Sequence, residues 1–581
     1  MERRLLLAIV LTFVVLTAYQ WLVPGVQPAA PGSTAAPGAQ QAAKQAAPAA
    51  PVSPSASAAP APAPTPAAVE AVRADTAERT VTVDNGVVRA VFSNRGATLA
   101  AWELLRYAGP NGRPVDLVPH DVPADQPKPF SLRIDDAVKT SRLNTALFTA
   151  TSGTAPIDSS ASNLDARTTP VTLTFEYEDA AGLRARKQFT LKPQSYEVTV
   201  SANVSDGDRT LNPFVQWGPG LGDVLAAAGH SMFGGVSTRL SEAIFSVGGK
   251  VQRTQSAALA TTPHYEGSYE FAGVDTHYFM STAVKPGAAE LVYHPLSVPS
   301  KNAEAAVSRA YVGYDIRFQS SPSGLANARF YVGPKHFDTL KQTDPDLVRA
   351  IWFGMFAFLS VPLLSALNWV HGFIGNYGWS IIALTFIINA AMFPLRHKSN
   401  VSMRKMQAIQ PQVKAIQDRY KHLKTTDPAR QKMNTEMMEL YRQKGVNPAS
   451  GCVPMLLTFP VLLAFYSLLS EAIELRNAPF IWWIHDLAAP DPFYVTPILM
   501  GASQVLQQKM MPMTGADPVQ QRMMLFMPII FTFLFITSPA GLALYWFASN
   551  VLVIGQQLLT NKMIGAPVGK RGETKKVESG K

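Results

Sequence analysis

Long uncharged apolar segments alternate with two other kinds of sequence along the chain, and this pattern divides it into regions. Residues 5–23 form an apolar run of 19 residues. At about 1.5 Å per residue, a helix of that length nearly spans a hydrocarbon core of about 30 Å. A cleaved signal peptide has a shorter apolar core followed by a small-residue cleavage site. We therefore predict a membrane-spanning anchor at 1–23, with cleavage as the alternative.

The next region has no apolar periodicity. Residues 24–70 are mainly Ala, Pro, Gly, Ser and Gln, and only Lys44 and Glu70 are charged. Such a segment cannot bury a core, so we predict a flexible tether over 24–76.

Residues 77–344 change to short alternating segments separated by turns. Residues 171–178 alternate between apolar and polar positions, turn at 179–182 and return through 187–191. This pattern predicts a large antiparallel β-sandwich. Polar clusters at 264–266 and 275–277 are typical of surface loops, and the alternative for them is a sugar or metal site.

After 345 the chain becomes apolar again. Five segments are long enough, or nearly so, to cross a membrane, and residues 352–370 are also uncharged. The five segments are 377–395, 452–470, 494–511, 523–537 and 541–560.

The distribution of charge decides how many of these segments cross. Residues 396–444 carry twelve Lys and Arg against four Asp and Glu, residues 471–493 one Arg against four acids, and residues 561–581 six Lys and Arg against two Glu. Basic loops stay on the cytoplasmic side. Both termini and 396–444 are therefore predicted to be cytoplasmic and the β-domain to lie outside the cytoplasm. Six spans satisfy this arrangement, whereas a seventh at 352–370 would invert every later loop. We therefore expect an interfacial amphipathic helix at 345–371.

Composition excludes several kinds of chemistry. Charged residues make up 16% of the chain, against about 25% in soluble proteins. The single cysteine, Cys452, excludes an internal disulfide and a zinc site built from several thiolates. No phosphate-binding loop, HExxH helix or GxSxG elbow is present. Nothing in the sequence suggests ATP hydrolysis or covalent catalysis.

Polar residues inside the predicted spans are the first functional signal, because they are costly there. Thr385, Asn389 and Arg396 fall within about 40° of one another on a helical wheel. Ser503, Gln504, Gln507 and Gln508 form two i,i+4 pairs, and Tyr545 and Trp546 lie one turn before Ser549 and Asn550. Hydrogen bonding between neighbouring helices is the alternative explanation for each residue. Three helices with such stripes favour a hydrated cavity, and the predicted groove residues are Thr385, Asn389, Arg396, Thr458, Gln504, Tyr545, Trp546, Ser549 and Asn550.

Methionines in the basic segment are the second signal. The segment is predicted to form two amphipathic helices around 423–428, and methionine suits apolar partners of varied shape. Packing in a core is the alternative for each methionine. The predicted contacts with substrate or ribosome are Met403, Arg404, Lys405, Met406, Met433, Met437 and Met438.

Eight short motifs stand in order along the C-terminal half. They are Gly-Val-Asn-Pro at 445–448, Gly-Cys-Val-Pro at 451–454, Glu-Leu-Arg-Asn-Ala-Pro-Phe at 474–480, Trp-Ile-His-Asp-Leu at 483–487, Asp-Pro at 491–492, Pro-Ile-Leu-Met-Gly at 497–501, Phe-Met-Pro at 526–528 and Ser-Pro-Ala-Gly at 538–541. Together they closely resemble the YidC/Oxa/Alb family of membrane protein insertases over roughly 345–560. The anchor, tether and β-domain resemble the long Gram-negative form in layout more than in motif.

The resemblance implies a multi-domain membrane protein with a helical transmembrane bundle and a large periplasmic antiparallel β super-sandwich. Within 372–560 it implies a five-helix insertase core around a hydrophilic groove that is open to the cytoplasm and lipid and closed outside. It also implies a cytoplasmic helical hairpin at 397–445 that receives substrate, followed by the basic tail at 561–581. The β-domain is implied to contact the Sec machinery.

This sequence departs from the family at one position. The family typically has an arginine in the second span, within a pattern such as Thr-Phe-Ile-x-Arg-x-x-Met-x-Pro-Leu. The corresponding residues 385–395 have asparagine there, at Asn389. The groove would thereby lose its fixed positive charge, although Asn389 can still hydrogen-bond. Arg396 lies two turns further on the same face, about 10 Å away, and we expect it to supply part of the lost field.

These observations predict an inner-membrane insertase and chaperone that uses neither nucleotide nor cofactor nor metal. The predicted partners are nascent integral membrane proteins, the Sec translocon (SecYEG and SecDF), the lipid bilayer, and the ribosome through the basic hairpin and tail. A small-solute transporter and a membrane-anchored periplasmic scaffold are the alternatives. No repeated half-structure typical of transporters is visible, and deletion of 77–340 would abolish the function of a scaffold only.

Overall fold

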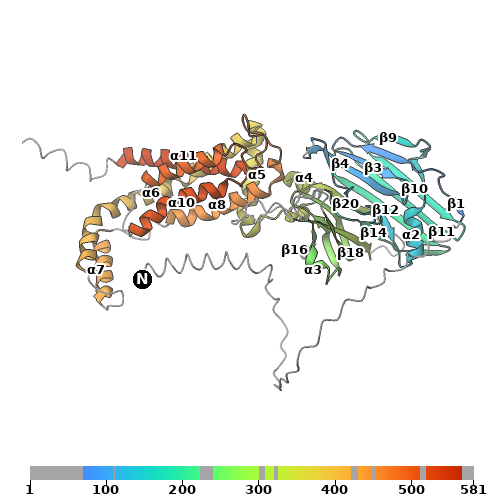
Figure 1. The fold of residues 1–581 in the computed structure, drawn as a ribbon, viewed down its shortest axis with the longest axis horizontal. Coiled ribbons are helices and arrows are strands. Elements are labelled where there is room, and N and C mark those ends of the chain that lie inside the picture. The colour runs from blue at the N-terminus through green and yellow to red at the C-terminus, as the bar shows by residue number, and fades with distance from the viewer. Residues whose placement is uncertain are drawn as a thin grey trace, which may run out of the picture. The chain divides into compact units, whose positions relative to one another are not determined.

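The computed structural model describes residues 70–109, 112–222, 240–299, 308–319, 325–420, 429–445, 453–510 and 518–564. The predicted anchor at 1–23, nearly all of the tether and most of the basic tail lie outside these residues. The described chain begins with β-strands and continues into helices after residue 334 (Figure 1).

Most of the strands belong to one 15-stranded sheet. Ten of them follow one another along it, and the other five pair with members of this path. In sheet order the ten are β16 (Lys250–Gln255), β15 (Glu242–Val247), β17 (His264–Asp275), β18 (Phe279–Pro299), β20 (Leu325–Pro334), β12 (Glu197–Asp206), β11 (Leu183–Leu191), β10 (Val171–Asp179), β7 (Thr149–Ser152) and β8 (Ala155–Pro156). The other five are β1 (Ala71–Arg73), β6 (Ser131–Arg133), β13 (Arg209–Leu211), β14 (Phe214–Trp217) and β19 (Ser308–Phe318).

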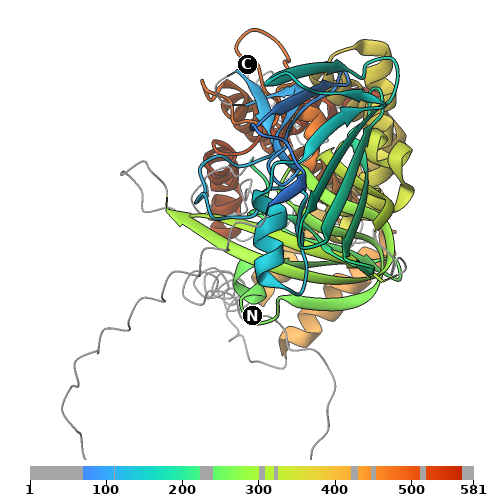
Figure 2. The same cartoon turned by 90° about the vertical axis from the view of Figure 1, so that its right-hand side faces the viewer.

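A second sheet has five strands and packs against the first. Its order is β5 (Pro114–Asp116), β4 (Thr98–Ala108), β3 (Val88–Ser93), β2 (Thr80–Asp84) and β9 (Ala161–Asp165). The ring of Phe92 in β3 lies 4.8 Å from that of Phe189 in β11 and 6.4 Å from that of Phe175 in β10. The two sheets therefore share one aromatic core, and their strands overlie one another in Figures 1 and 2.

The predicted antiparallel β-domain is confirmed, with one parallel pair between β2 and β9. The predicted turn at 179–182 joins β10 to β11, whose register pairs Glu178 with Arg184. The Asp179 carboxylate accepts hydrogen bonds from the N–H groups of Ala181 and Leu183 at 2.9 and 3.0 Å. Gly182 has a φ of 86°, which glycine adopts without strain.

The helices carry the apolar segments of the C-terminal half, except for two short ones within the β-domain. Those two are α2 (Ala137–Thr145) and α3 (Ser256–Leu259). The others are α4 (Phe337–Thr343), η1 (Pro345–Ala350), η2 (Gly354–Phe356), α5 (Ala357–Ile374), α6 (Tyr377–Arg419), α7 (Ala429–Gln443), α8 (Val453–Glu471), η4 (Ile473–Leu475), α9 (Val495–Met510), α10 (Pro518–Phe535) and α11 (Ala540–Ile564).

Among the described residues, three helices are long and apolar enough to cross a membrane. They are Gly354–Ile374, Tyr377–Ser402 and Ala540–Thr560, and Phe459–Glu471 and Phe526–Phe535 are shorter apolar helices. The segment predicted as one interfacial helix at 345–371 instead begins with two 3₁₀ turns before α5. Residues 351–353 separate the turns, and Gly354, the first residue of the second turn, has a φ of 63°. The interfacial position of α5 stays a prediction.

Helix α6 runs without a break from the second predicted span into the predicted hairpin, although it contains Pro394 and Pro411. Helix α7 packs back against it, which is visible at the end of the helical region in Figure 1. Within the bundle α11 packs against both α6 and α9. The polar stripes of these three helices are thus brought close together.

Candidate functional site

The polar stripe of α6 lies in the interior of the helical region. Thr385 is fully buried and Asn389 is 4% exposed. The Thr385 hydroxyl donates to the Ile381 carbonyl at 2.6 Å, and the Asn389 side-chain amide donates to the Thr385 carbonyl at 2.8 Å. Both donors are therefore satisfied within the helix itself, and the Asn389 side-chain oxygen can accept from another group.

Arg396 supplies the donor for that oxygen. Its guanidinium Nη1 donates to Asn389 Oδ1 at 2.5 Å. Long side chains on a helix lean toward the N-terminal end, so the charge lies beside Asn389 and not two turns away. Among the described residues, no ion pair includes Arg396. A half-buried cation without a carboxylate partner therefore lies at the position where the family pattern has its arginine.

Helix α11 adds a residue that sequence reasoning missed. Gln556 Nε2 donates to the Asn389 backbone carbonyl at 3.0 Å, and Gln556 Oε1 is buried without a described partner. One turn later, Thr560 lies 3.4 Å from His397 Nδ1. The signal was present in the sequence, because Gln556 is seven residues after Ser549 and therefore continues the same helix face. Together α6 and α11 form a polar cluster of Asn389, Arg396 and Gln556.

Side-chain hydrogen bonds join α9 to α11. Asn550 Nδ2 donates to Ser503 Oγ at 3.0 Å and to the Met500 carbonyl at 3.3 Å. Gln557 Nε2 donates to the Met510 carbonyl at 2.7 Å. The alternative explanation, hydrogen bonding between helices, therefore accounts for the burial of the Asn550 side chain. Its predicted role in lining a groove stays a prediction.

The remaining predicted groove residues differ in their surroundings. Gln504 Oε1 is buried without a described partner, and Ser549 is half-buried. The ring of Tyr545 stacks on Phe465 of α8 at 4.2 Å, and Trp546 lies 4.9 Å from Phe535 of α10. The two aromatic residues thus join α11 to different neighbours. Thr458 lies outside the side chains that the structure describes.

The methionines of the hairpin divide into two groups. Met406 and Met437 pack against Ile409 and Val413 in a small core between α6 and α7. Core packing therefore accounts for these two. Met438 is 59% exposed and Met433 is half-buried, while Lys405 is exposed. Met403 and Arg404 lie outside the described side chains.

The segment between α8 and α9 holds the ends of several helices. The Asp491 carboxylate accepts the N–H of Thr496 at 2.8 Å, the N–H of Phe493 at 3.0 Å and the indole N–H of Trp483 at 3.0 Å. Burial alone would raise the pKa of Asp491, but the N–H donors of Thr496 and Phe493 lower it. The N–H groups of Ala540 and Gly541 donate to carbonyls of the same segment, at 2.8 and 2.9 Å. This outer loop, residues 472–494, therefore caps α9 and holds the start of α11.

Two polar clusters in the β-domain were predicted as surface loops. His264 lies 3.0 Å from Glu290 and 3.7 Å from Glu266, but Arg317 already pairs with Glu290 at 3.5 Å and the group is largely exposed. The surface interpretation is wrong for 275–277. Asp275 pairs with buried Lys335 at 3.1 Å, and His277 contacts the end of α8. These residues are buried because the β-domain meets the helical region there.

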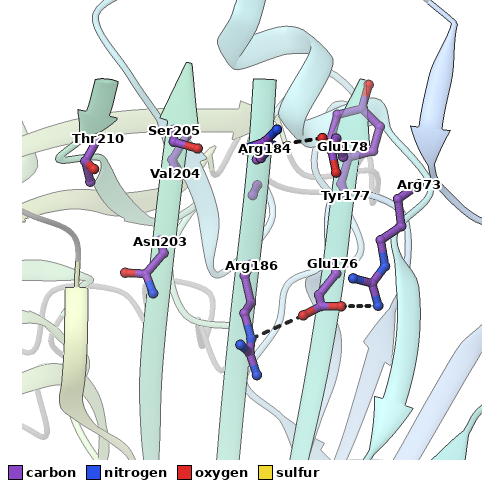
Figure 3. Close-up of a pocket in the computed structure, with 11 residues that line it drawn as sticks. Arg73, Glu176, Tyr177, Glu178, Arg184, Arg186, Asn203, Val204, Ser205 and Thr210 are labelled. Carbon is purple, nitrogen blue, oxygen red and sulfur yellow. Dashed lines mark hydrogen bonds and ion pairs between the residues drawn. The ribbon is translucent and has the colours of Figure 1, made fainter. Parts of the chain in front are cut away.

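A shallow cavity of about 400 Å³ lies on the face of β10, β11 and β12 (Figure 3). Arg184 pairs with Glu178 at 2.8 Å, and Glu176 pairs with both Arg186 and Arg73. These charges balance one another, as is common on a solvated sheet face, and we assign the cavity no function.

Comparisons with known proteins fit this architecture. Two family models match the chain: the YidC periplasmic domain over residues 80–366 and the 60Kd inner membrane protein over residues 369–566. The membrane protein insertase YidC of Citrifermentans bemidjiense is 35% identical over 571 residues, covering 97% of this chain and 100% of that protein. The YidC of Geobacter metallireducens is 34% identical over 581 residues, covering 98% and 100%.

A solved structure, described as an active YidC insertase crystal structure with the first transmembrane domain resolved, is also similar. It covers 85% of this chain and 95% of its own, with 17% identity and a TM-score of 0.35. That score is below the level at which a structural likeness bears on the fold.

A periplasmic β-domain joined to an apolar helical region with a polar interior defines a multi-pass protein of the inner membrane. The chain belongs to the YidC family of membrane protein insertases. Its function is membrane protein insertion, it is not an enzyme, and family membership favours this function over the transporter and scaffold alternatives.

Proposed function

We propose that this insertase passes the polar segment of a membrane protein substrate along a groove between α6, α9 and α11, and that Arg396 supplies the groove's positive charge. The observation that carries the proposal is the 2.5 Å hydrogen bond from Arg396 to Asn389. It brings the guanidinium to the level of the residue that replaces the family's arginine. An acidic group in a substrate tail would then meet a cation that has no described carboxylate partner.

The energetic role of such a groove is to shorten the path of polar groups through hydrocarbon. One charge at the centre of a bilayer costs roughly 3 kcal/mol on insertion scales. A substrate helix of about 20 apolar residues contributes roughly 0.5 kcal/mol per residue, or about 10 kcal/mol in total. The membrane potential adds about 2.3 kcal/mol per charge per 100 mV. These terms are sufficient without nucleotide hydrolysis.

The remaining parts of the proposal concern topology and partners. We infer six spans with both termini cytoplasmic, a five-helix core within 372–560, an interfacial α5 and a periplasmic β super-sandwich. The hairpin of α6 and α7 would receive nascent membrane proteins, with exposed Met438 as its apolar contact. The basic charge of 396–444 suits a ribosome or anionic lipid. The Sec translocon is the proposed partner of the β-domain.

The test is insertion of a short-tailed, single-span substrate into liposomes that contain the purified full-length protein. Arg396→Leu should reduce the insertion rate at least tenfold more than Lys398→Leu, because Lys398 is exposed and Arg396 is half-buried beside Asn389. Equal losses in the two variants would contradict the proposal.

A second pair of variants tests the replacement at 389. Asn389→Leu removes the acceptor that holds Arg396 and should impair insertion. Asn389→Arg, which restores the family's residue, should leave insertion near the wild-type level. If the wild type is inactive and Asn389→Arg restores insertion, the charge of Arg396 does not substitute for the arginine and the mechanism is wrong.

A further inference from the structure

A buried carboxyl group joins the outer loop to the segment that leaves the β-domain. Glu474 lies in η4, is 8% exposed, and accepts a hydrogen bond from the backbone N–H of Phe337 at 2.9 Å. Phe337 is the first residue of α4 and is 4% exposed, and Leu340 of the same helix is fully buried. Helix α4 is thereby fastened to the loop between α8 and α9 through its backbone, and its apolar face is buried.

A second contact ties α4 to the helical region. Asn368 of α5 donates to the Asp338 carboxylate at 3.1 Å, and the Tyr377 hydroxyl at the start of α6 donates to Asn368 Oδ1 at 3.4 Å. Helix α4 therefore contacts α5 as well as the outer loop. The guanidinium of Arg329 in β20 also donates to the Thr343 carbonyl at the end of α4, at 3.1 Å. Helix α4 therefore bridges the two regions, although the sequence placed it inside the β-domain.

The outer loop in turn holds the ends of other helices. Asn376, which caps α6, donates to the carbonyls of Pro479 and Phe480 at 3.1 Å each. Gly378 leaves room for the ring of Phe480, since a Cβ there would lie 2.1 Å from the nearest ring carbon. Together with the caps that Asp491 gives α9 and the bonds to Ala540 and Gly541, the loop connects the outer ends of α6, α8, α9 and α11.

The β-domain contacts the same loop at separate points. His277 Nε2 lies 3.0 Å from the Ser470 carbonyl at the end of α8. The guanidinium of Arg476 lies 5.1 Å from the ring centres of both Tyr278 and Phe279, within the range of a cation–π contact. Asn477 donates to the Ala108 carbonyl at 3.2 Å. Glu474 is thus the buried member of a joint between the β-domain, α4 and the outer loop.

We propose that Glu474 is a positioning residue that fastens α4 to the outer loop and so keeps the outer end of the insertase bundle closed while a substrate enters from the other side. The inference rests on the insertase activity and does not depend on the proposed role of Arg396. It also moves the functional boundary of the insertase from residue 345 to the start of α4.

Protonation should change the strength of this joint. Burial raises the pKa of Glu474 above its ordinary value of 4.5, and His336 and the Phe337 N–H oppose that rise. The other titratable groups that face Glu474 are Asp338, Tyr107 of β4 and Tyr377 of α6. A carboxyl whose pKa is raised in the closed state binds its proton more tightly there. The stability of the joint therefore decreases as the pH rises from 4.5 through the raised pKa, and it stays constant at higher pH.

The experiment uses full-length protein in liposomes with the β-domain facing the lumen. Insertion is measured from the bath at constant pH while the lumenal pH is varied from 5 to 8. At lumenal pH 5 the wild type and Glu474→Gln, which keeps an acceptor but cannot ionise, should insert at similar rates. At lumenal pH 8 the wild type should insert at least threefold more slowly than Glu474→Gln, because its carboxyl is then ionised. Both proteins experience the same pH gradient at each lumenal pH, so the driving force cancels in this ratio.

The matched control is Asp486→Asn, whose carboxylate lies in the same loop and, among the described residues, accepts an N–H only from Ala488, at 2.8 Å. It should keep the wild-type pH profile. A ratio of wild-type to Glu474→Gln rates that is the same at lumenal pH 5 and pH 8 would overturn the proposal. Arg396→Leu, measured in the same liposomes, should be slow at every pH and retain the wild-type ratio between pH 5 and pH 8. Failure of the groove proposal is therefore distinguishable from failure of the joint.

Discussion

The β-domain buries its large apolar side chains, whereas the helical region leaves several of them exposed and buries polar ones. In the β-domain Phe92, Phe175 and Phe189 are fully buried, and charged residues lie outside as ion pairs. In the helical region Phe386 and Phe533 are 58% and 78% exposed, while Thr385 and Asn389 are buried. The difference shows that apolar surface is covered by protein in one region and left for lipid in the other. Polar side chains are the informative interior residues in both.

Lys187 is an ionisable side chain buried in the core of the β-domain. It is 1% exposed, and its Nζ lies within hydrogen-bonding distance of the carbonyl oxygens of Gly96, Phe130 and Ala97, at 2.7, 2.8 and 3.1 Å. Lys187→Ala removes all three contacts and leaves a cavity, so we expect a loss of about 3–5 kcal/mol in the free energy of unfolding. Denaturant unfolding followed by tryptophan fluorescence measures it. The exposed Lys192, substituted in the same way, should cost under about 1 kcal/mol.

The close packing of α9 against α10 at Gly501 can be tested by substitution. A Cβ at Gly501 would lie 1.9 Å from Thr532 Oγ1, whereas a Cβ at Gly555 meets no atom within 4 Å. Gly501→Val should therefore destabilise the bundle by about 1–3 kcal/mol. The midpoint of thermal unfolding in detergent provides the measurement, with Gly555→Val as the matched control. A similar shift for both variants would show that α9 and α10 do not pack as closely as described.

Lys187 also predicts a pH dependence confined to the β-domain. Burial lowers the pKa of Lys187 from 10.5 to about 7. Between these values the unfolded chain binds one more proton than the folded chain, so stability rises with pH across that window. The slope should be about 1.4 kcal/mol per pH unit. Lys187→Met should remove it, and a slope that survives this substitution must come from other groups.

The smallest expected loss of stability comes from the contact that Asn550 makes between α11 and α9. Asn550→Leu breaks its bonds to Ser503 and the Met500 carbonyl, and in a membrane such bonds are worth about 0.6 kcal/mol on average and at most about 1.7. We expect a loss in that range, measured by unfolding of the bundle. Phe533→Leu, on the lipid-exposed surface, should change stability by less than about 0.5 kcal/mol. A larger effect of Phe533→Leu would indicate that another chain covers that surface.

The apolar and polar patterns were sufficient to predict the β-domain and the helical region. Alternation at 171–178 and the turn after it predicted β10 and β11, because one face of a strand is buried and the pleat repeats every two residues. The stripe of Thr385, Asn389 and Arg396 was also predictable, since residues four and seven apart share a helix face. The boundary of α4 was not, because nothing local distinguishes a short helix of the β-domain from one that packs on the bundle.

The sequence by itself determined the order of the regions, the family and the residues on each helix face, because these depend on local periodicity and motif. Only the tertiary structure decided which polar residues meet. It turned Arg396 back onto Asn389, joined Gln556 of α11 to the same residue, and buried Asp275, His277 and Glu474 where the β-domain meets the helices. The physical reason is that hydrogen bonding and burial between distant segments depend on packing in three dimensions, which periodicity along one element does not specify.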